Sequence, residues 1–102
     1  MPAKNVQMAR FKVKPERATE FEEAAKRLFA DIQEKLPDGM RYTLGRLSDG
    51  VTYVGLLELD DGIENPLPGL PEGKKFLESL PTWAAEPPAR DQLTVIGSYR
   101  FF

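Results

Sequence analysis

The chain has 102 residues, 41% of them hydrophobic, which is enough to fill one core, so we expect a single folded domain over residues 1–102. Fourteen Lys and Arg oppose sixteen Asp and Glu, and this net charge of −2 argues against nucleic acid or an anionic membrane as partners. Cysteine and histidine are both absent, which excludes disulfides, thiolate or imidazole catalysis and zinc sites built on these residues.

No apolar run approaches the roughly 20 residues that span a bilayer, and the N-terminal residues lack the apolar core of a signal peptide. A cytoplasmic protein without membrane partners is therefore expected.

A strand followed by an amphipathic helix is predicted first. Residues 6–14 alternate, with Ala9, Phe11 and Val13 on one face, as in a strand. Pro15 and the acidic residues after it favour a helix start near residue 16. Apolar residues then recur at helical spacing until Pro37 ends the helix. They are Phe21, Ala25, Leu28, Phe29, Ile32 and Leu36.

Two paired strands come next. Residues 40–47 and 51–59 are β-like and flank Ser48-Asp49-Gly50, a hairpin signal because Asp-Gly readily takes positive φ. Prolines and glycines in residues 60–72 predict a loop that could act as a lid.

The chain then predicts a short second helix and a last strand. The helix covers residues 73–80, ends at Pro81 and could gain one further turn through Trp83. Residues 92–102 form the last predicted strand. One face of that strand would carry Leu93, Val95, Gly97, Tyr99 and Phe101.

The resulting order, βαββαβ, is that of a ferredoxin-like α+β domain, in which two helices cover one face of a four-stranded antiparallel sheet. The other face would be too apolar to stay fully wet, and sheet-on-sheet self-association would cover it. Its expected residues are Met8, Val54, Leu56, Ile96 and Phe102, mixed with Arg10, Lys12 and Glu58.

Three segments carry a family resemblance over nearly the whole chain: ARFKVKPERATEFEEAAKRL, LPDGMRYTLGRL and VGLLELDD. With them the chain resembles the antibiotic-biosynthesis-monooxygenase-like family. The resemblance implies a homodimer that forms a dimeric α/β barrel, with a pocket between each sheet and its helices. It also implies a cofactor-free oxygenase for polycyclic phenols. A haem-degrading member is not expected, because histidine is absent and Ala9 and Asp60 replace the asparagine and tryptophan of those enzymes.

A cofactor-free oxygenase must bind a flat phenol, help to remove its proton and exclude water. The candidate catalytic residues are Tyr42, Tyr53 and Arg46, with Arg46 stabilising an enolate or phenolate. The candidate substrate-binding residues are Phe11, Phe76 and Trp83. We expect Tyr42, Tyr53 and Trp83 to meet above the sheet. Strand alternation puts Arg46 on the face of Tyr42 and puts Arg41 on the opposite face.

Two other interpretations remain open, because no acid–base pair stands out in the sequence and each aromatic could be a core residue. One is a non-catalytic dimer that binds a metabolite or acts as a stress-response accessory protein. The other is an assembly module whose pocket is filled by phenylalanines. Asp60, Asp61 and Glu64 match no EF-hand spacing, so no metal site is expected.

Overall fold

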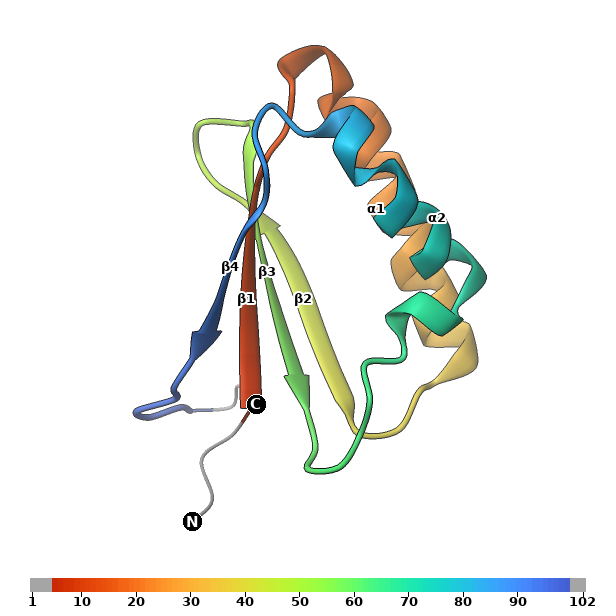
Figure 1. Cartoon of the computed structure of the whole chain (residues 1–102), viewed down its shortest axis with the longest axis vertical. Helices are drawn as coiled ribbons and strands as arrows, with labels where there is room; N and C mark the ends of the chain where they lie inside the picture. The colour runs from red at the N-terminus through yellow and green to blue at the C-terminus, as the bar shows by residue number, and fades with distance from the viewer. Residues whose placement is uncertain (1–4, 100–102) are drawn as a thin grey trace.

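The computed structural model describes residues 5–99 and has the predicted order of strands and helices (Figure 1). The strands β1 (Asn5–Lys12), β2 (Met40–Arg46), β3 (Thr52–Leu59) and β4 (Ala89–Leu93) form an antiparallel sheet in the order β2-β3-β1-β4. The helices α1 (Ala18–Lys35) and α2 (Pro71–Trp83) cover one face of this sheet, and the short 3-10 helices η1 (Pro15–Arg17) and η2 (Leu67–Gly69) precede them. The ferredoxin-like prediction is confirmed.

Strand register decides which side chains meet the helices. Phe11 pairs with Tyr53, and Tyr42 pairs with Leu57, and all four side chains belong to the core or pack against it. Because side chains alternate along a strand, Arg41 and Glu58 lie on the opposite face. The predicted shared face of Ala9, Phe11 and Val13 is therefore the one that belongs to the core. Within residues 5–99 no helix combines the length and apolarity needed to traverse a membrane.

The ring of Phe21 is the centre of the core. This side chain is 0% exposed. Its centroid lies 4.5 Å from that of Tyr53, 5.4 Å from that of Phe76 and 5.6 Å from that of Trp83. The rings meet at tilted or edge-on angles, which suit the quadrupoles of aromatic rings. Phe21 thus joins α1 to β3 and α2.

The turn between β2 and β3 lies where the sequence predicts it. Gly50 has φ +79°, and its N–H donates to the Leu47 carbonyl at 3.1 Å. The Asp49 carboxylate accepts hydrogen bonds from the Thr52 hydroxyl (2.5 Å), the Thr52 N–H (2.8 Å) and the Val51 N–H (3.0 Å). These bonds, led by that of the hydroxyl, lower the pKa of Asp49 from 3.8 to about 2.

Asp49 should therefore contribute to the acid sensitivity of the fold. A carboxyl whose pKa is lower in the folded state stabilises it above the ordinary pKa of 3.8, and that stabilisation is lost as the pH falls towards about 2. The variant Asp49→Asn accepts backbone hydrogen bonds without titrating. We expect urea unfolding to show a shallower loss of stability across this pH range for the variant, and identical slopes would contradict this role.

The end of α1 differs in detail from the prediction. The helix ends before Pro37 as expected, but Leu36 takes a left-handed conformation (φ 49°) as the C-cap, and its N–H donates to the Ile32 carbonyl at 2.8 Å. The turn carries the side chain off the apolar face of the helix, and Leu36 is 74% exposed. Its predicted place on the apolar face of the helix is wrong.

Helix α2 begins two residues before the predicted start at residue 73, and at its other end it includes the further turn through Trp83 that the sequence analysis allowed. Pro71 occupies the first turn, where the missing N–H costs no helical hydrogen bond. Pro81 lies inside the last turn and does not end the helix, because the Ala84 N–H still donates to the Leu80 carbonyl at 2.9 Å. The predicted loop over residues 60–72 therefore includes η2 and the start of α2.

Contacts at both ends of α2 fix its position, one set with η2 and the other with β1 and the residues after it. A Cβ on Gly73 would lie 2.0 Å from the Leu67 carbonyl oxygen, so η2 approaches the helix this closely because residue 73 is glycine. At the other end of α2, the Lys14 N–H donates to the Trp83 carbonyl (2.9 Å), and the Ala85 N–H donates to the Lys12 carbonyl (2.7 Å).

The last strand lies earlier than predicted. It covers Ala89–Leu93 and pairs with β1, whereas residues 94–99 are not part of a strand, and Phe101 and Phe102 lie outside the described residues. Every residue of β4 is exposed, as in short polar edge strands. Its sequence ARDQL therefore lacks the apolar alternation on which the prediction relied.

Candidate functional site

A cavity of about 310 Å³ lies between the helix-facing side of the sheet and α2, and we call it the sheet–α2 cavity. Its apolar wall includes Phe11, Leu28, Leu57, Phe76 and Leu77. Polar residues from three segments line it as well, and they are Gln7, Asn65, Arg90, Asp91 and Gln92. An apolar cavity of this size with a few polar groups is typical of small-molecule sites.

Tyr42 contributes the phenol of this cavity. Its ring lies over β3 at Gly55, where a Cβ would be 3.4 Å from the Tyr42 hydroxyl oxygen. Burial raises the pKa of Tyr42 above 10.0, and the positive charge of Arg90 acts in the opposite direction. At neutral pH the hydroxyl is therefore protonated and can donate a hydrogen bond, but it cannot serve as a base.

Arg90 was not among the residues that the sequence pattern suggested. It pairs with Ala9 in the β1–β4 ladder and therefore shares the helix-facing side with Gln92. The predicted last strand begins at residue 92, so Arg90 falls outside the predicted alternation. The signal that could have found Arg90 is the short run ARDQL after Pro87 and Pro88, read as a polar edge strand.

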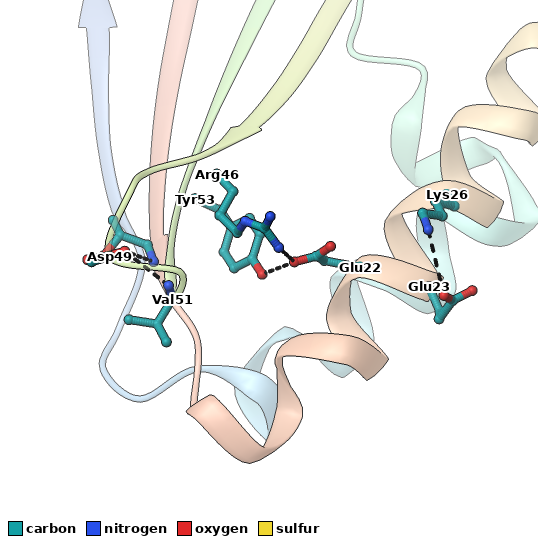
Figure 2. A network of polar contacts seen from close by, with 8 residues as sticks. Glu22, Glu23, Lys26, Arg46, Asp49, Val51 and Tyr53 are labelled. Atoms are coloured by element: carbon teal, nitrogen blue, oxygen red, sulfur yellow. Dashed lines mark hydrogen bonds and ion pairs between the residues drawn. The ribbon is translucent and has the colours of Figure 1, made fainter.

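A second cavity, of about 240 Å³, lies between α1 and the β2–β3 hairpin, and we call it the α1–β2 cavity. Tyr53 and Arg46 line it, and they both point from the strands towards Glu22 of α1 (Figure 2). The Tyr53 hydroxyl donates to Glu22 Oε2 at 2.5 Å, and Arg46 Nη1 donates to the same oxygen at 2.7 Å.

The three groups of this cluster hold one another in fixed protonation states. The hydrogen bond from Tyr53, and then that from Arg46, lower the pKa of Glu22 below 4.5. Burial and the bond to Glu22 raise the pKa of Tyr53 to about 12. At neutral pH Glu22 is therefore ionised, and Tyr53 keeps its proton.

The variant Tyr53→Phe tests this cluster. It removes the donor with the largest effect on Glu22, so we expect the Glu22 pKa to rise towards 4.5, as followed by NMR titration of its carboxyl carbon. The lost hydrogen bond should lower the free energy of unfolding by about 1 kcal/mol. Tyr42→Phe is the matched control, and an equal rise of the Glu22 pKa in both variants would contradict the assignment.

The structure does not bring all predicted site residues together. Phe11, Phe76 and Tyr42 line the sheet–α2 cavity, whereas Tyr53 and Arg46 line the α1–β2 cavity. Trp83 lines neither of these. Its ring packs against Phe21, and its indole N–H donates to Glu20 Oε2 at 2.9 Å.

Arg41, on the sheet face away from the helices, forms ion pairs with two carboxylates, and one of these belongs to the acidic loop. Arg41 donates from Nε to Glu58 and from Nη2 to Asp60 Oδ1 at 2.6 Å. Both carboxylates support the charged form of Arg41 and raise its pKa. Over residues 5–99, no group of three or more acidic side chains is arranged to hold a metal ion.

Solved structures share this fold. A candidate antibiotic biosynthesis monooxygenase from Caulobacter crescentus is 24% identical over 93% of this chain and 92% of its own, with a TM-score of 0.74. A protein from Pseudomonas aeruginosa is 17% identical, with coverages of 95% and 98% and a TM-score of 0.75. SnoaB, a cofactor-independent oxygenase from Streptomyces nogalater, is 20% identical, with coverages of 96% and 98% and a TM-score of 0.70.

No family model and no curated protein matches the chain. The resemblance to antibiotic biosynthesis monooxygenases is thus confirmed in the fold, while the activity has to be argued from the site.

Proposed function

We propose that this protein binds a flat aromatic or phenolic small molecule in the sheet–α2 cavity and oxidises it with molecular oxygen, without a metal or prosthetic group. The observation that carries the proposal is the meeting of the apolar wall with the Tyr42 hydroxyl and the Arg90 guanidinium in one cavity. The shared fold with a cofactor-independent oxygenase supports it.

Tyr42 and Arg90 have different tasks in this proposal. The protonated Tyr42 hydroxyl donates a hydrogen bond to an oxygen of the ligand and orients it. The charge of Arg90 stabilises the phenolate or enolate that forms when the ligand loses its proton. This electron-rich anion is the species that reacts with oxygen. In the balanced reaction, an activated CH₂ group becomes C=O, and the second oxygen atom leaves as water with the two hydrogens.

A second candidate is ligand binding without catalysis. This candidate is favoured because the carboxylate–phenol pair of Glu22 and Tyr53 lines the α1–β2 cavity. The pair therefore cannot act as an acid–base pair on a ligand in the sheet–α2 cavity. In this case the sheet–α2 cavity holds its ligand and leaves it unchanged.

Two measurements test the proposal. Fluorescence titration with a naphthol tests binding, and oxygen uptake with anthrone-like and quinol substrates tests the reaction. The variant Leu77→Trp should fill the cavity and abolish both, whereas Lys74→Trp, on the exposed side of the same helix, should change neither. Binding without oxygen uptake would establish the second candidate, and binding that survives Leu77→Trp would refute the site.

We also propose a homodimer that forms through the sheet face away from the helices. Met8, Val54 and Leu56 are half-buried on this face beside the exposed Arg10 and Lys12, and a second copy would remove this apolar surface from water.

The variant Leu56→Asp should be monomeric in light scattering, because it places a charge in the interface. The control Ala30→Asp, on the exposed side of α1, should remain dimeric. A wild-type protein that is monomeric at micromolar concentration would contradict the dimer.

A further inference from the structure

The two cavities meet at a pair of stacked aromatic rings. Tyr42 lines the sheet–α2 cavity, and Phe29 lines the α1–β2 cavity. Their ring centroids lie 5.1 Å apart, with an interplanar angle of 11°. The pair therefore stands between the two spaces, one ring on each side.

The sheet forms a continuous floor under this boundary. Leu44 of β2 lines the α1–β2 cavity, while its register partner Gly55 lines the sheet–α2 cavity. A Cβ on Gly55 would lie 3.6 Å from Leu44 Cδ1, so the two linings are adjacent. The floor residues are thus direct neighbours, and the stacked rings of Phe29 and Tyr42 stand above them.

We propose that the Phe29–Tyr42 pair determines ligand length by closing the sheet–α2 cavity off from the α1–β2 cavity, which becomes an extension subsite when one of the two rings is removed. This inference rests on the proposed function. The sheet–α2 cavity alone is at the small end of the range for ligand sites, at about 310 Å³, and the subsite would add about 240 Å³.

The lining of the subsite indicates what the extended part of a ligand would look like. Phe21, Ala25 and Leu44 give it apolar walls. The polar cluster of Glu22, Tyr53 and Arg46 lies in the same cavity. Both hydrogen bonds of this cluster use Glu22 Oε2, and over residues 5–99 no side chain donates to Oε1. A ligand that reaches the subsite after removal of a ring would be an elongated aromatic molecule with a hydroxyl at its far end.

Two probes measure ligand length: a naphthol, and the same naphthol extended by a hydroxybiphenyl group. The measured quantity is the ratio of their dissociation constants, naphthol over extended naphthol. Phe29→Ala and Tyr42→Ala should each raise this ratio at least about tenfold, because another ring can then be buried in the subsite. Filling the subsite with Ala25→Leu in the Phe29→Ala background should cancel the gain.

Two controls separate this effect from a general change in the site. Lys74→Ala alters the exposed side of α2 outside both cavities, and Phe29→Tyr keeps a ring in the stacked pair, so both should leave the ratio at its wild-type value. Near-ultraviolet circular dichroism establishes that each variant is folded, and Phe29→Ala and Tyr42→Ala test the same boundary from opposite sides.

The possible outcomes are distinguishable. If the wild-type protein binds neither probe, the proposed function itself fails. If it binds naphthol but removal of either ring leaves the ratio unchanged, or if the wild-type protein already prefers the extended probe, the extension subsite is refuted while the proposed function stands. A crystal structure of Phe29→Ala with the extended naphthol must show the biphenyl group beside Ala25 and Leu44.

Discussion

Replacing Arg90 by methionine is expected to lower the rate of oxygen uptake with a short phenolic substrate by about a hundredfold. Loss of one group that stabilises a developing oxyanion typically costs a factor of about 10² to 10³, and the exposure of Arg90 favours the lower end. Methionine keeps the unbranched stem, so the loss would come from the charge. The measurement is oxygen consumption at saturating substrate, where kcat reports the reaction and not binding.

The variant Arg46→Met is the matched control. Arg46 bonds to Glu22 in the α1–β2 cavity, so its loss should leave oxygen uptake with a short substrate unchanged. The sequence makes Arg46 the candidate for anion stabilisation, because it carries a guanidinium and strand alternation places it on the face of Tyr42. If Arg46→Met slows the reaction while Arg90→Met does not, the role belongs to Arg46 and our assignment is wrong.

The variant Phe21→Ala should lower the free energy of unfolding by about 3 to 5 kcal/mol, the range for a buried phenylalanine truncated to alanine. Phe21 is fully buried, and its ring packs against Tyr53, Phe76 and Trp83. The remaining cavity would lie where α1, α2 and the sheet meet, so neighbouring rings cannot close it without moving whole elements. Urea denaturation measures the change.

Phe29→Ala serves as the comparison on the same helix. Phe29 is half-buried and stacks on one ring, that of Tyr42, so its truncation should cost clearly less than that of Phe21. Equal losses for the two variants would show that Phe21 is not the centre of the core.

Most of the fold could be predicted because its elements have strong periodic patterns. The alternation around Phe11 and the helical spacing from Phe21 to Ile32 reflect burial on one face, and that burial is seen in the structure. A hydrophobic pattern does not predict an element whose residues are mostly exposed. Strand β4 is exposed throughout and is held by its ladder with β1, so its residues carry no apolar signal.

The candidate site was harder to predict than the fold, because facing the same side of a sheet does not put two residues in the same cavity. Tyr42 and Tyr53 both face the helices, as alternation requires, yet they line different spaces. What separates them is the stacking of Phe29 on Tyr42, a contact between a helix and a strand that no spacing along the chain encodes.

The close approach of Gly73 to the Leu67 carbonyl packs η2, in the segment after β3, tightly against α2. The Leu67 N–H also donates to Asn65 Oδ1 at 3.0 Å, and these three residues all line the sheet–α2 cavity. This part of the cavity wall is therefore preorganised before a ligand arrives. If the proposed ligand binds here, its affinity would not be reduced by the entropy of ordering this segment, and association would not wait for this segment to close over the ligand.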